Sequence, residues 1–218
     1  MIIGIPVYQG VDLLDVAGPH EVFGWMGDDV EIRLIAASTA TPIVTRDKFS
    51  FNATHTFADT PKLTALWVPG GAPDALAQMM RGGDYLDFLN EQARSADWVC
   101  SVCEGALLLA AAGLLDGHDA TTHWMFVPCL KTFDKINVVD GFPRFVESRK
   151  PSGNRLTGGG ISSGLDESLQ LVRLLQGDDA AREVQRTIQY YPQPAFPSDL
   201  VAPLHCEFQG LTQHAPAA

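Results

Sequence analysis

The chain has 218 residues, 46% of them hydrophobic and 19% charged, a balance typical of a compact globular domain. Its formal net charge is −11 and no block of Lys or Arg stands out. Nucleic acid and anionic membrane surfaces are therefore excluded as expected partners, because both are bound through local positive charge. The N-terminus lacks the basic start of a signal peptide, and the longest uncharged apolar run, 105–115, is too short to cross a membrane. We expect a cytoplasmic protein whose four cysteines are reduced.

Short apolar runs alternate with helical patterns through the first half of the chain. Asp15 is a predicted N-cap of the first helix, in which apolar residues recur at helical spacing as far as Met26. Pro69-Gly70-Gly71 is a predicted turn at the end of a strand, and Asp74 is a predicted N-cap of the helix that follows. The predicted elements of this half are strands at 2–8, 31–37 and 65–68, a hairpin-like extended stretch at 41–51, and helices after Asp15, at 75–80 and at 84–96.

The most informative stretch of the chain places a cysteine between a strand and a helix. The apolar strand 98–102 runs into Cys103, and an apolar helix is predicted at 106–115. Gly105 lets the backbone turn sharply where a side chain would clash. Since a helix N-terminus stabilises a thiolate, this elbow predicts a cysteine ionised for covalent chemistry. The alternative is a small buried hydrophobic residue, which is the usual role of a free cysteine.

The second half of the chain continues the alternation, with predicted strands at 120–123, 137–139, 144–147 and 155–157 and helices at 124–133, 165–175 and 178–190. Strands that alternate with helices indicate a mainly parallel sheet covered by helices on both faces. We predict one α/β domain over 1–208 and a flexible tail over 209–218. Active sites of such sheets lie beyond the carboxyl ends of the strands, where the loop to Asp15, the turn 69–72 and Cys103 all fall.

Cys100 and Cys103 also form a C-x-x-C pattern, which is found in redox pairs and zinc sites. Cys100 falls inside the predicted strand, and residues three apart on a strand point to opposite faces. Cys129 and Cys206 each stand alone in the sequence, without the spacing of further zinc ligands. Redox or metal use of this pattern is therefore disfavoured.

Three further features are candidates for the same site, each with a structural alternative. The backbone N–H groups of Gly70 and Gly71 are candidate donors to developing charge, although a tight turn needs glycine in any case. His123 is a candidate base for Cys103, but a packed, structural histidine is the favoured interpretation. The glycine-rich loop 158–160 before Ile161 is expected to form a wall of the substrate pocket.

The motifs LLDVAGPHEVF, WVPGG, VCEGALLLAAAGLLDG, ATTHW and GGGISSGLDESLQLV, in this order over residues 1–195, resemble those of the ThiJ/PfpI superfamily. Within it they are most similar to isonitrile hydratases, also called isocyanide hydratases. The resemblance implies a flavodoxin-like three-layer sandwich with a cysteine nucleophile elbow. It also implies a homodimer that uses neither a metal nor an organic cofactor.

For the reaction, the resemblance implies that Cys103 adds to the terminal carbon of an isonitrile and that Asp15 transfers protons. Backbone donors would come from Gly70, Gly71 and Glu104, and the pocket from His123, Gly159, Gly160 and Ile161. Glu104 departs from the residue common in hydratases at its position, and its carboxylate would raise the pKa of the cysteine if it faced the site. Two other functions stay open: a glyoxalase- or deglycase-like enzyme acting on small carbonyls, and a ligand- or redox-sensing module of the same fold.

Overall fold

A computed structural model describes residues 1–196, 200–206 and 208. Its main sheet has seven strands in the order β10-β11-β7-β6-β1-β2-β5. All neighbouring pairs are parallel except the hairpin of β10 with β11. The strands are β1 (Ile2–Pro6), β2 (Glu31–Ala36), β5 (His55–Thr56), β6 (Ala65–Val68), β7 (Trp98–Ser101), β10 (Phe145–Lys150) and β11 (Gly153–Gly158). The predicted tail 209–218 lies outside the described residues.

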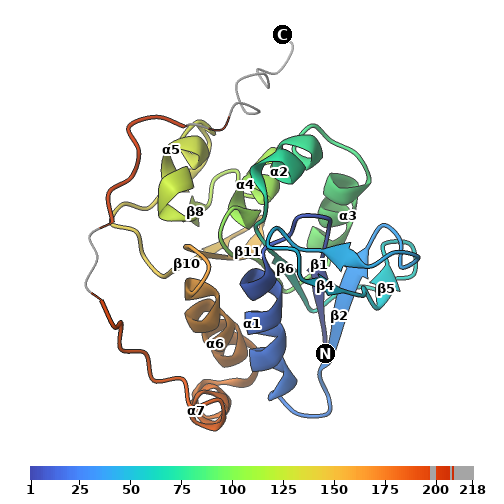
Figure 1. The fold of residues 1–218 in the computed structure, drawn as a ribbon. Coiled ribbons are helices and arrows are strands. Elements are labelled where there is room, and N and C mark those ends of the chain that lie inside the picture. The colour runs from blue at the N-terminus through green and yellow to red at the C-terminus, as the bar shows by residue number, and fades with distance from the viewer. Residues whose placement is uncertain (197–199, 207, 209–218) are drawn as a thin grey trace.

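Helices cover the sheet on both faces, which confirms the predicted three-layer α/β architecture (Figure 1). On one face, α1 (Leu13–Gly24) packs against α6 (Ser163–Gln176), and α7 (Asp178–Thr187) packs on α6. The other face carries α2 (Pro73–Met79), α3 (Asp84–Ala93) and α4 (Gly105–Ala111), with α3 and α4 in contact. A 3₁₀ turn, Trp124–Phe126, leads into the short helix α5 (Val127–Leu130) beside α4.

Two small sheets complete the described structure. The strands β3 (Ile43–Val44) and β4 (Ser50–Phe51) pair antiparallel, which confirms the predicted hairpin, and β8 (Asp119–Ala120) pairs in parallel with β9 (Asn137–Val138). The β3–β4 hairpin contacts the loop before α1, where the Arg46 N–H donates to the Val11 carbonyl at 3.1 Å. This contact brings residues from the hairpin to the carboxyl end of β1.

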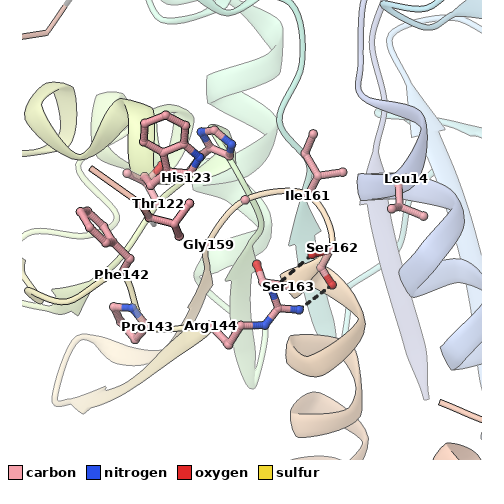
Figure 2. A pocket seen from close by; sticks show the side chains of 13 residues that line it. Leu14, Thr122, His123, Phe142, Pro143, Arg144, Gly159, Ile161, Ser162 and Ser163 are labelled. Carbon is pink, nitrogen blue, oxygen red and sulfur yellow. Dashed lines mark hydrogen bonds between the residues drawn. The ribbon is translucent and has the colours of Figure 1, made fainter. Parts of the chain in front are cut away.

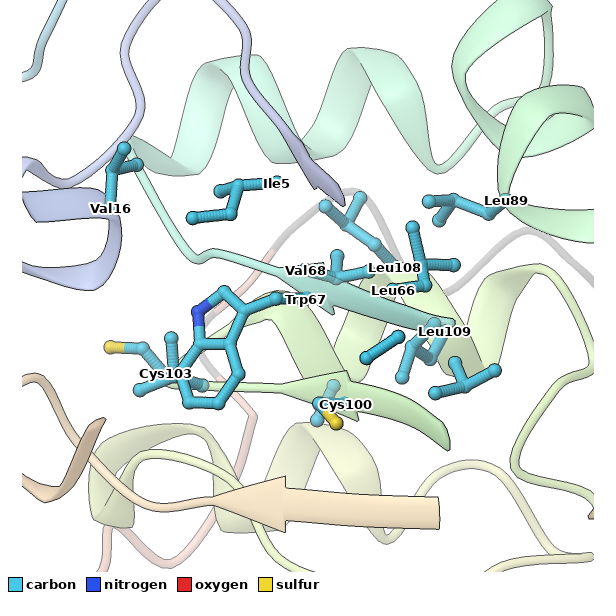
Figure 3. Close-up of a cluster of buried hydrophobic side chains, with 14 of the residues drawn as sticks. Ile5, Val16, Leu66, Trp67, Val68, Leu89, Cys100, Cys103, Leu108 and Leu109 are labelled. Carbon is cyan, nitrogen blue, oxygen red and sulfur yellow. The ribbon is translucent and has the colours of Figure 1, made fainter. Parts of the chain in front are cut away.

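The centre of the sheet is apolar on both faces because helices cover both. Every residue of β6 and β7 is buried, and Ile5, Trp67 and Cys100 are fully inaccessible to solvent in the cluster drawn in Figure 3. The one polar atom of the Trp67 ring, its Nε1–H, donates to the Asp15 carbonyl at 3.1 Å. That bond ties the first turn of α1 to the middle of the sheet, and so fixes the position of Asp15.

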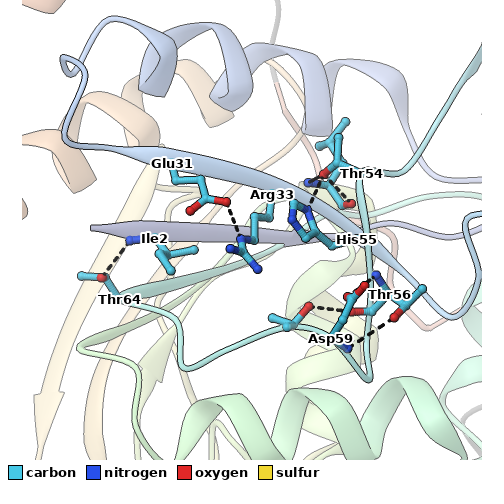
Figure 4. Close-up of polar contacts among 10 residues, drawn as sticks. Ile2, Glu31, Arg33, Thr54, His55, Thr56, Asp59 and Thr64 are labelled. Atoms are coloured by element: carbon cyan, nitrogen blue, oxygen red, sulfur yellow. Dashed lines mark hydrogen bonds and ion pairs between the residues drawn. The ribbon is translucent and has the colours of Figure 1, made fainter.

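The edge at β2 and β5 is short and polar rather than apolar (Figure 4). Arg33 pairs with Glu31 at 2.7 Å, and the Thr54 hydroxyl donates to the Leu34 carbonyl at 3.1 Å. The Thr56 N–H donates to Asp59 at 2.7 Å. Such an edge satisfies its own polar groups locally, which protects the sheet from pairing with another chain.

Two predicted helix starts were wrong. The N-cap of α1 is Asp12, and Asp15 lies inside the first turn with its side chain directed to Gly70. The N-cap of α2 is Ala72, and the helix begins at Pro73, one residue before Asp74. Proline favours the first helical position because its fixed φ suits the helix and its missing N–H has no partner to lose.

The expectation of four reduced cysteines was also wrong. Cys129 in α5 and Cys206 form a disulfide across 77 positions of sequence, whereas Cys100 and Cys103 are free. The bond ties Cys206, which lies beyond the end of α7 in the sequence, back to α5, and Phe126 and Phe208 also make an edge-to-face contact at 6.3 Å. Within the described residues, no helix combines the length and the apolar character needed to cross a membrane.

Candidate active site

Cys103 occupies a strained elbow between β7 and α4, as predicted. Its φ is +56°, a left-handed conformation that is uncommon for residues other than glycine. Its N–H donates to the Gly159 carbonyl at 2.8 Å, and its carbonyl accepts from the Thr122 hydroxyl at 2.8 Å. A Cβ on Gly105 would lie 2.1 Å from the Val68 carbonyl oxygen, so the turn is closed to any larger residue at this position. These contacts hold the backbone in the strained conformation and fix the start of the side chain.

Three carboxyl groups surround the sulfur. One side-chain oxygen from each of Asp12, Asp15 and Glu104 lies within 4.8 Å of Cys103 Sγ and of the other oxygens, and all four residues are buried. We call this set the acid–thiol cluster. Asp15 is held by the Gly70 N–H, which donates to its Oδ2 at 2.9 Å. The cluster confirms that the first helix and the elbow meet at the carboxyl ends of the strands.

The electrostatics of the cluster favour neutral acids. Burial raises the pKa of the Cys103 thiol well above its ordinary value, and the carboxyl groups of Asp15 and Glu104 raise it further. Burial likewise raises the pKa of Asp15 well above that of a free carboxyl, and Asp12 and Glu104 add to this increase. The pKa of Glu104 is raised by burial as well. Burial and the carboxyl groups thus oppose the ionisation that the N-terminus of α4 favours. The ionised Cys103 expected from the sequence stays a prediction.

Glu104 faces the site, which resolves the departure noted in the sequence. A Cβ on Gly70 would lie 2.4 Å from Glu104 Oε2 and 2.9 Å from Cys103 Cβ, so Gly70 is the residue that makes room for both. This close approach is a stronger requirement for glycine than the turn alone.

The backbone N–H of Ile161 lowers the pKa of the Cys103 thiol. Gly71 lies against the loop before α1, where a Cβ would meet the Gly10 carbonyl oxygen at 2.6 Å. The hydrogen bonds of this pairing run from Asp12 N–H to Gly70 O and from Ala72 N–H to Gly10 O. The groups that pair are those of Gly70 and Ala72, on either side of Gly71, so the Gly71 N–H takes no part in the pairing. Its role as a donor to substrate remains a prediction.

Asp12 and Arg46 were missed from sequence. Asp12 is 4% exposed and forms an ion pair with Arg46, whose Nε lies 2.7 Å from Asp12 Oδ1. Arg46 itself is half exposed at the surface above the cluster. Burial raises the pKa of Asp12, and the Arg46 guanidinium opposes that increase. No local signal identified this pair, because it depends on how the β3–β4 hairpin folds over the loop before α1.

A pocket of about 400 Å³ lies next to the elbow (Figure 2). It contains all four residues that were predicted to line the substrate site: His123, Gly159, Gly160 and Ile161. Apolar and aromatic side chains supply most of the remaining wall: Leu14, Trp124, Phe142, Pro143 and Leu200. Figure 2 shows the Ile161 side chain standing between His123 and Leu14.

Cys103 is 1% exposed and does not itself line the pocket. Three residues of the wall nevertheless act on it: Thr122 and Gly159 through hydrogen bonds to its backbone, and Ile161 through a backbone N–H that lowers the pKa of its thiol. The sulfur thus lies immediately behind the pocket wall, and a small substrate must pass that wall to reach it.

His123 is part of the pocket wall, where local contacts hold its ring. Its Nδ1 accepts a hydrogen bond from the Met125 N–H at 3.3 Å, and a Cβ on Gly160 would lie 2.0 Å from its Cδ2. Burial lowers its pKa, and the charge of Arg46 lowers it further, so the ring is neutral at neutral pH. The favoured structural interpretation of His123 agrees with these contacts.

Cys100 lies apart from the elbow. It is fully buried and free, and in Figure 3 its sulfur points away from Cys103. The C-x-x-C pattern therefore forms no redox pair in this structure.

Comparisons with known proteins agree with this arrangement. The chain is 39% identical over 196 residues to the isonitrile hydratase of Pseudomonas putida, which covers 90% of this chain and 81% of that protein. A ThiJ/PfpI family protein from Pseudomonas syringae has a crystal structure with a TM-score of 0.81 and 34% identity, covering 89% of this chain and 77% of that one. The HTH-type transcriptional regulator GbdR of Pseudomonas aeruginosa is 33% identical over 108 residues, which is 48% of this chain and 26% of the regulator. Residues 2–156 match the DJ-1/PfpI family, and the chain belongs to that family.

Proposed function

We propose that the protein is an isonitrile hydratase, a lyase that adds water to an isonitrile and releases an N-substituted formamide. The terminal carbon of an isonitrile accepts both a nucleophile and a proton. The acid–thiol cluster offers both within one buried volume, since Cys103 Sγ and a carboxyl oxygen of Asp15 lie within 4.8 Å of each other. This proximity, in a chain 39% identical to an isonitrile hydratase, carries the proposal.

In the first step, the Cys103 sulfur forms a bond to the terminal carbon as its own proton passes to a carboxylate of the cluster. The same carbon receives a proton from the Asp15 carboxyl group, and the product is a thioimidate, R–N=CH–S–Cys103. The raised pKa of Asp15 suits this role, because a carboxyl group that keeps its proton near neutral pH is a competent general acid.

In the second step, water adds to the thioimidate carbon and Asp15, now a carboxylate, takes one proton of the attacking water. The carbon–sulfur bond breaks as the second proton of the water passes to the nitrogen. The sulfur regains its own proton from the carboxyl group that took it in the first step, and the formamide R–NH–CHO leaves. Over the cycle, one isonitrile and one water give one formamide, and the thiol and the carboxyl groups return to their starting protonation states. Asp15 acts first as an acid and then as a base. Burial and its acidic neighbours raise its pKa, and the hydrogen bond from the Gly70 N–H lowers it.

The pocket supports an apolar R group on the substrate. Aromatic and aliphatic side chains form most of its wall, and the Arg144 guanidinium at its edge is already paired with Asp166. An uncharged substituent gains by leaving water for such a wall, while the isonitrile group is directed past Ile161 toward the sulfur.

The test is turnover of a simple alkyl or aryl isonitrile, followed as formamide formation, with Cys103→Ala and Asp15→Asn measured beside the wild type. We expect no turnover for the cysteine variant and a severe loss for the aspartate variant. Glu91→Gln, on the exposed surface of α3, is a matched control that should retain the wild-type rate. Full activity in Cys103→Ala would end the proposal. Conversion of methylglyoxal to lactate at a much higher rate would favour the glyoxalase-like alternative.

A second candidate is a ligand-sensing module, which is supported by the similarity to part of the GbdR regulator. A sensor binds its ligand reversibly and leaves it chemically unchanged. Saturable binding of an isonitrile without formamide release, and with full binding in Cys103→Ala, would favour this candidate over the enzyme.

A further inference from the structure

We infer that the acid–thiol cluster binds one borderline-soft divalent cation of the Zn²⁺ type, and that the bound cation blocks Cys103. The cluster joins one sulfur and three carboxyl oxygens, all within 4.8 Å of one another. Thiolate and carboxylate are established zinc ligands, with Zn–S and Zn–O distances of about 2.3 and 2.0 to 2.2 Å. A tetrahedral ion of that size separates its ligands by about 3.3 to 3.8 Å, so a contraction of about 1 Å completes the site.

The ligands come from two elements that the fold already holds together. Asp12 and Asp15 lie at the start of α1, and Cys103 and Glu104 lie at the elbow before α4. Gly70 packs between them, since its N–H donates to Asp15 and a Cβ added to it would meet Cys103 and Glu104. A site assembled in this way requires only side-chain rotation to close on an ion.

Unpartnered oxygens point independently to a ligand. Asp15 is 0% exposed and Glu104 is 6% exposed. Asp15 Oδ1 and Glu104 Oε2 nevertheless have no hydrogen-bond partner among the described residues. Leaving a buried acceptor unsatisfied is costly, and native structures rarely do so without a reason. A cation held between these oxygens would satisfy both.

The donor set selects the kind of cation. Mg²⁺ and Ca²⁺ prefer six or more oxygen ligands, whereas a single sulfur with three carboxyl oxygens suits Zn²⁺ and its larger, softer analogue Cd²⁺. Of the two cysteines in the C-x-x-C pattern, only Cys103 belongs to the proposed site, because Cys100 lies elsewhere in the core.

Arg46 competes with the ion. Its guanidinium is the positive charge already paired with Asp12, and its half-exposed position places it between the cluster and solvent. A divalent cation must displace it from Asp12 Oδ1 on entry. Removal of this charge should therefore tighten metal binding, whereas removal of a ligand should weaken it. Substitutions on the two sides of one ion pair thus have opposite predicted effects.

The experiment is a titration of the intact protein with Cd²⁺, followed by the ultraviolet charge-transfer band of the Cd–thiolate bond, with Zn²⁺ added afterwards as competitor. This signal depends on neither isonitrile turnover nor the proposed function. We expect a band that saturates at one equivalent in the wild type and in Cys100→Ser, and that Zn²⁺ abolishes. The band should be absent in Cys103→Ser. Binding should weaken about tenfold or more in Asp12→Asn and strengthen in Arg46→Gln.

The pattern of variants decides the matter. A band that persists in Cys103→Ser but disappears in Cys100→Ser would place the metal at the wrong cysteine and overturn the inference. Absence of a saturable band in the wild type, or weaker binding in Arg46→Gln, would overturn it as well. Circular dichroism of each variant verifies folding, and Arg46→Gln, a change at the surface, keeps the test decisive if a buried variant does not fold. Zinc-loaded wild type should also resist alkylation at Cys103.

Discussion

The Cα of Gly105 lies against the carbonyl oxygen of Val68, so closely that a Cβ on Gly105 would be 2.1 Å from that oxygen. Val68 is the last residue of β6, and the chain continues from it into Pro69, Gly70 and Gly71. The contact therefore holds the end of β6 against the elbow. Gly70 consequently reaches Asp15, Cys103 and Glu104 at once.

Replacement of Gly105 by alanine should be strongly destabilising. The added methyl group meets a backbone atom, which cannot rotate away as a side chain would. We expect a loss of about 3 kcal/mol in the free energy of unfolding, measured by urea denaturation. Gly24→Ala is the matched control: no atom lies within 4 Å of its added Cβ, and it should change stability by less than about 1 kcal/mol. Equal stability of the two variants would show that the elbow is not packed as described.

Glu104 should oppose ionisation of the nucleophile. The negative charge of its carboxyl group, close to the sulfur, raises the pKa of Cys103. In Glu104→Gln, the alkylation of Cys103 by iodoacetamide should therefore reach its midpoint at a lower pH than in the wild type. Mass spectrometry of the labelled Cys103 peptide gives the rate at each pH. An unchanged or higher midpoint would show that the carboxyl group does not act on the sulfur.

Glu167 should make stability fall as pH rises. It is fully buried in α6, and both its oxygens lack a hydrogen-bond partner among the described residues. Burial raises its pKa well above the ordinary value, and the nearby charge of Asp15 raises it further. The unfolded chain releases this proton near pH 4.3, as a rough guide. Above that pH the folded state binds more protons, so the free energy of unfolding decreases until the folded pKa is reached.

In Glu167→Gln this contribution is absent, because the amide does not titrate. The stability of the variant relative to the wild type should therefore increase between pH 5 and pH 8, as measured by urea denaturation at each pH. A difference that is constant with pH would show that Glu167 ionises normally.

The disulfide predicts the number of reactive thiols. Iodoacetamide added to the denatured, unreduced protein should label Cys100 and Cys103 and leave Cys129 and Cys206 unlabelled. Reduction should lower the thermal midpoint, because it releases a closed loop of 77 residues and the unfolded chain gains entropy. Labelling of all four thiols before reduction would show that the bond is not formed.

The parts of the site that sequence predicted well depend on local pattern. The elbow follows from an apolar strand, a cysteine, a glycine two positions later and an apolar helix, and the structure contains each of them. The meeting of Asp15 with Cys103 follows from the rule that parallel strands place their carboxyl ends at one edge. The pocket wall of His123 and Gly159 to Ile161 follows from family resemblance rather than from local physics.

The parts that sequence did not predict depend on contacts between distant segments. Arg46 reaches Asp12 only because the hairpin of β3 and β4 folds over the loop before α1. Cys129 and Cys206 meet across 77 residues, and no spacing rule connects them. The helix N-terminus beside Cys103 is visible in the sequence, whereas the buried carboxyl groups of Asp15 and Glu104, which raise the pKa of its thiol, are not.

The central claim is that Cys103 bonds to the substrate carbon and that Asp15 supplies the proton which that carbon receives. The most direct measurement is mass spectrometry of protein quenched during reaction with an excess of isonitrile. We expect the wild type to carry an adduct whose added mass equals one isonitrile, located by peptide mapping on Cys103, whereas Asp15→Asn forms much less of it and Cys103→Ala carries none. An adduct on Cys100, or formamide production by Cys103→Ala, would contradict the account.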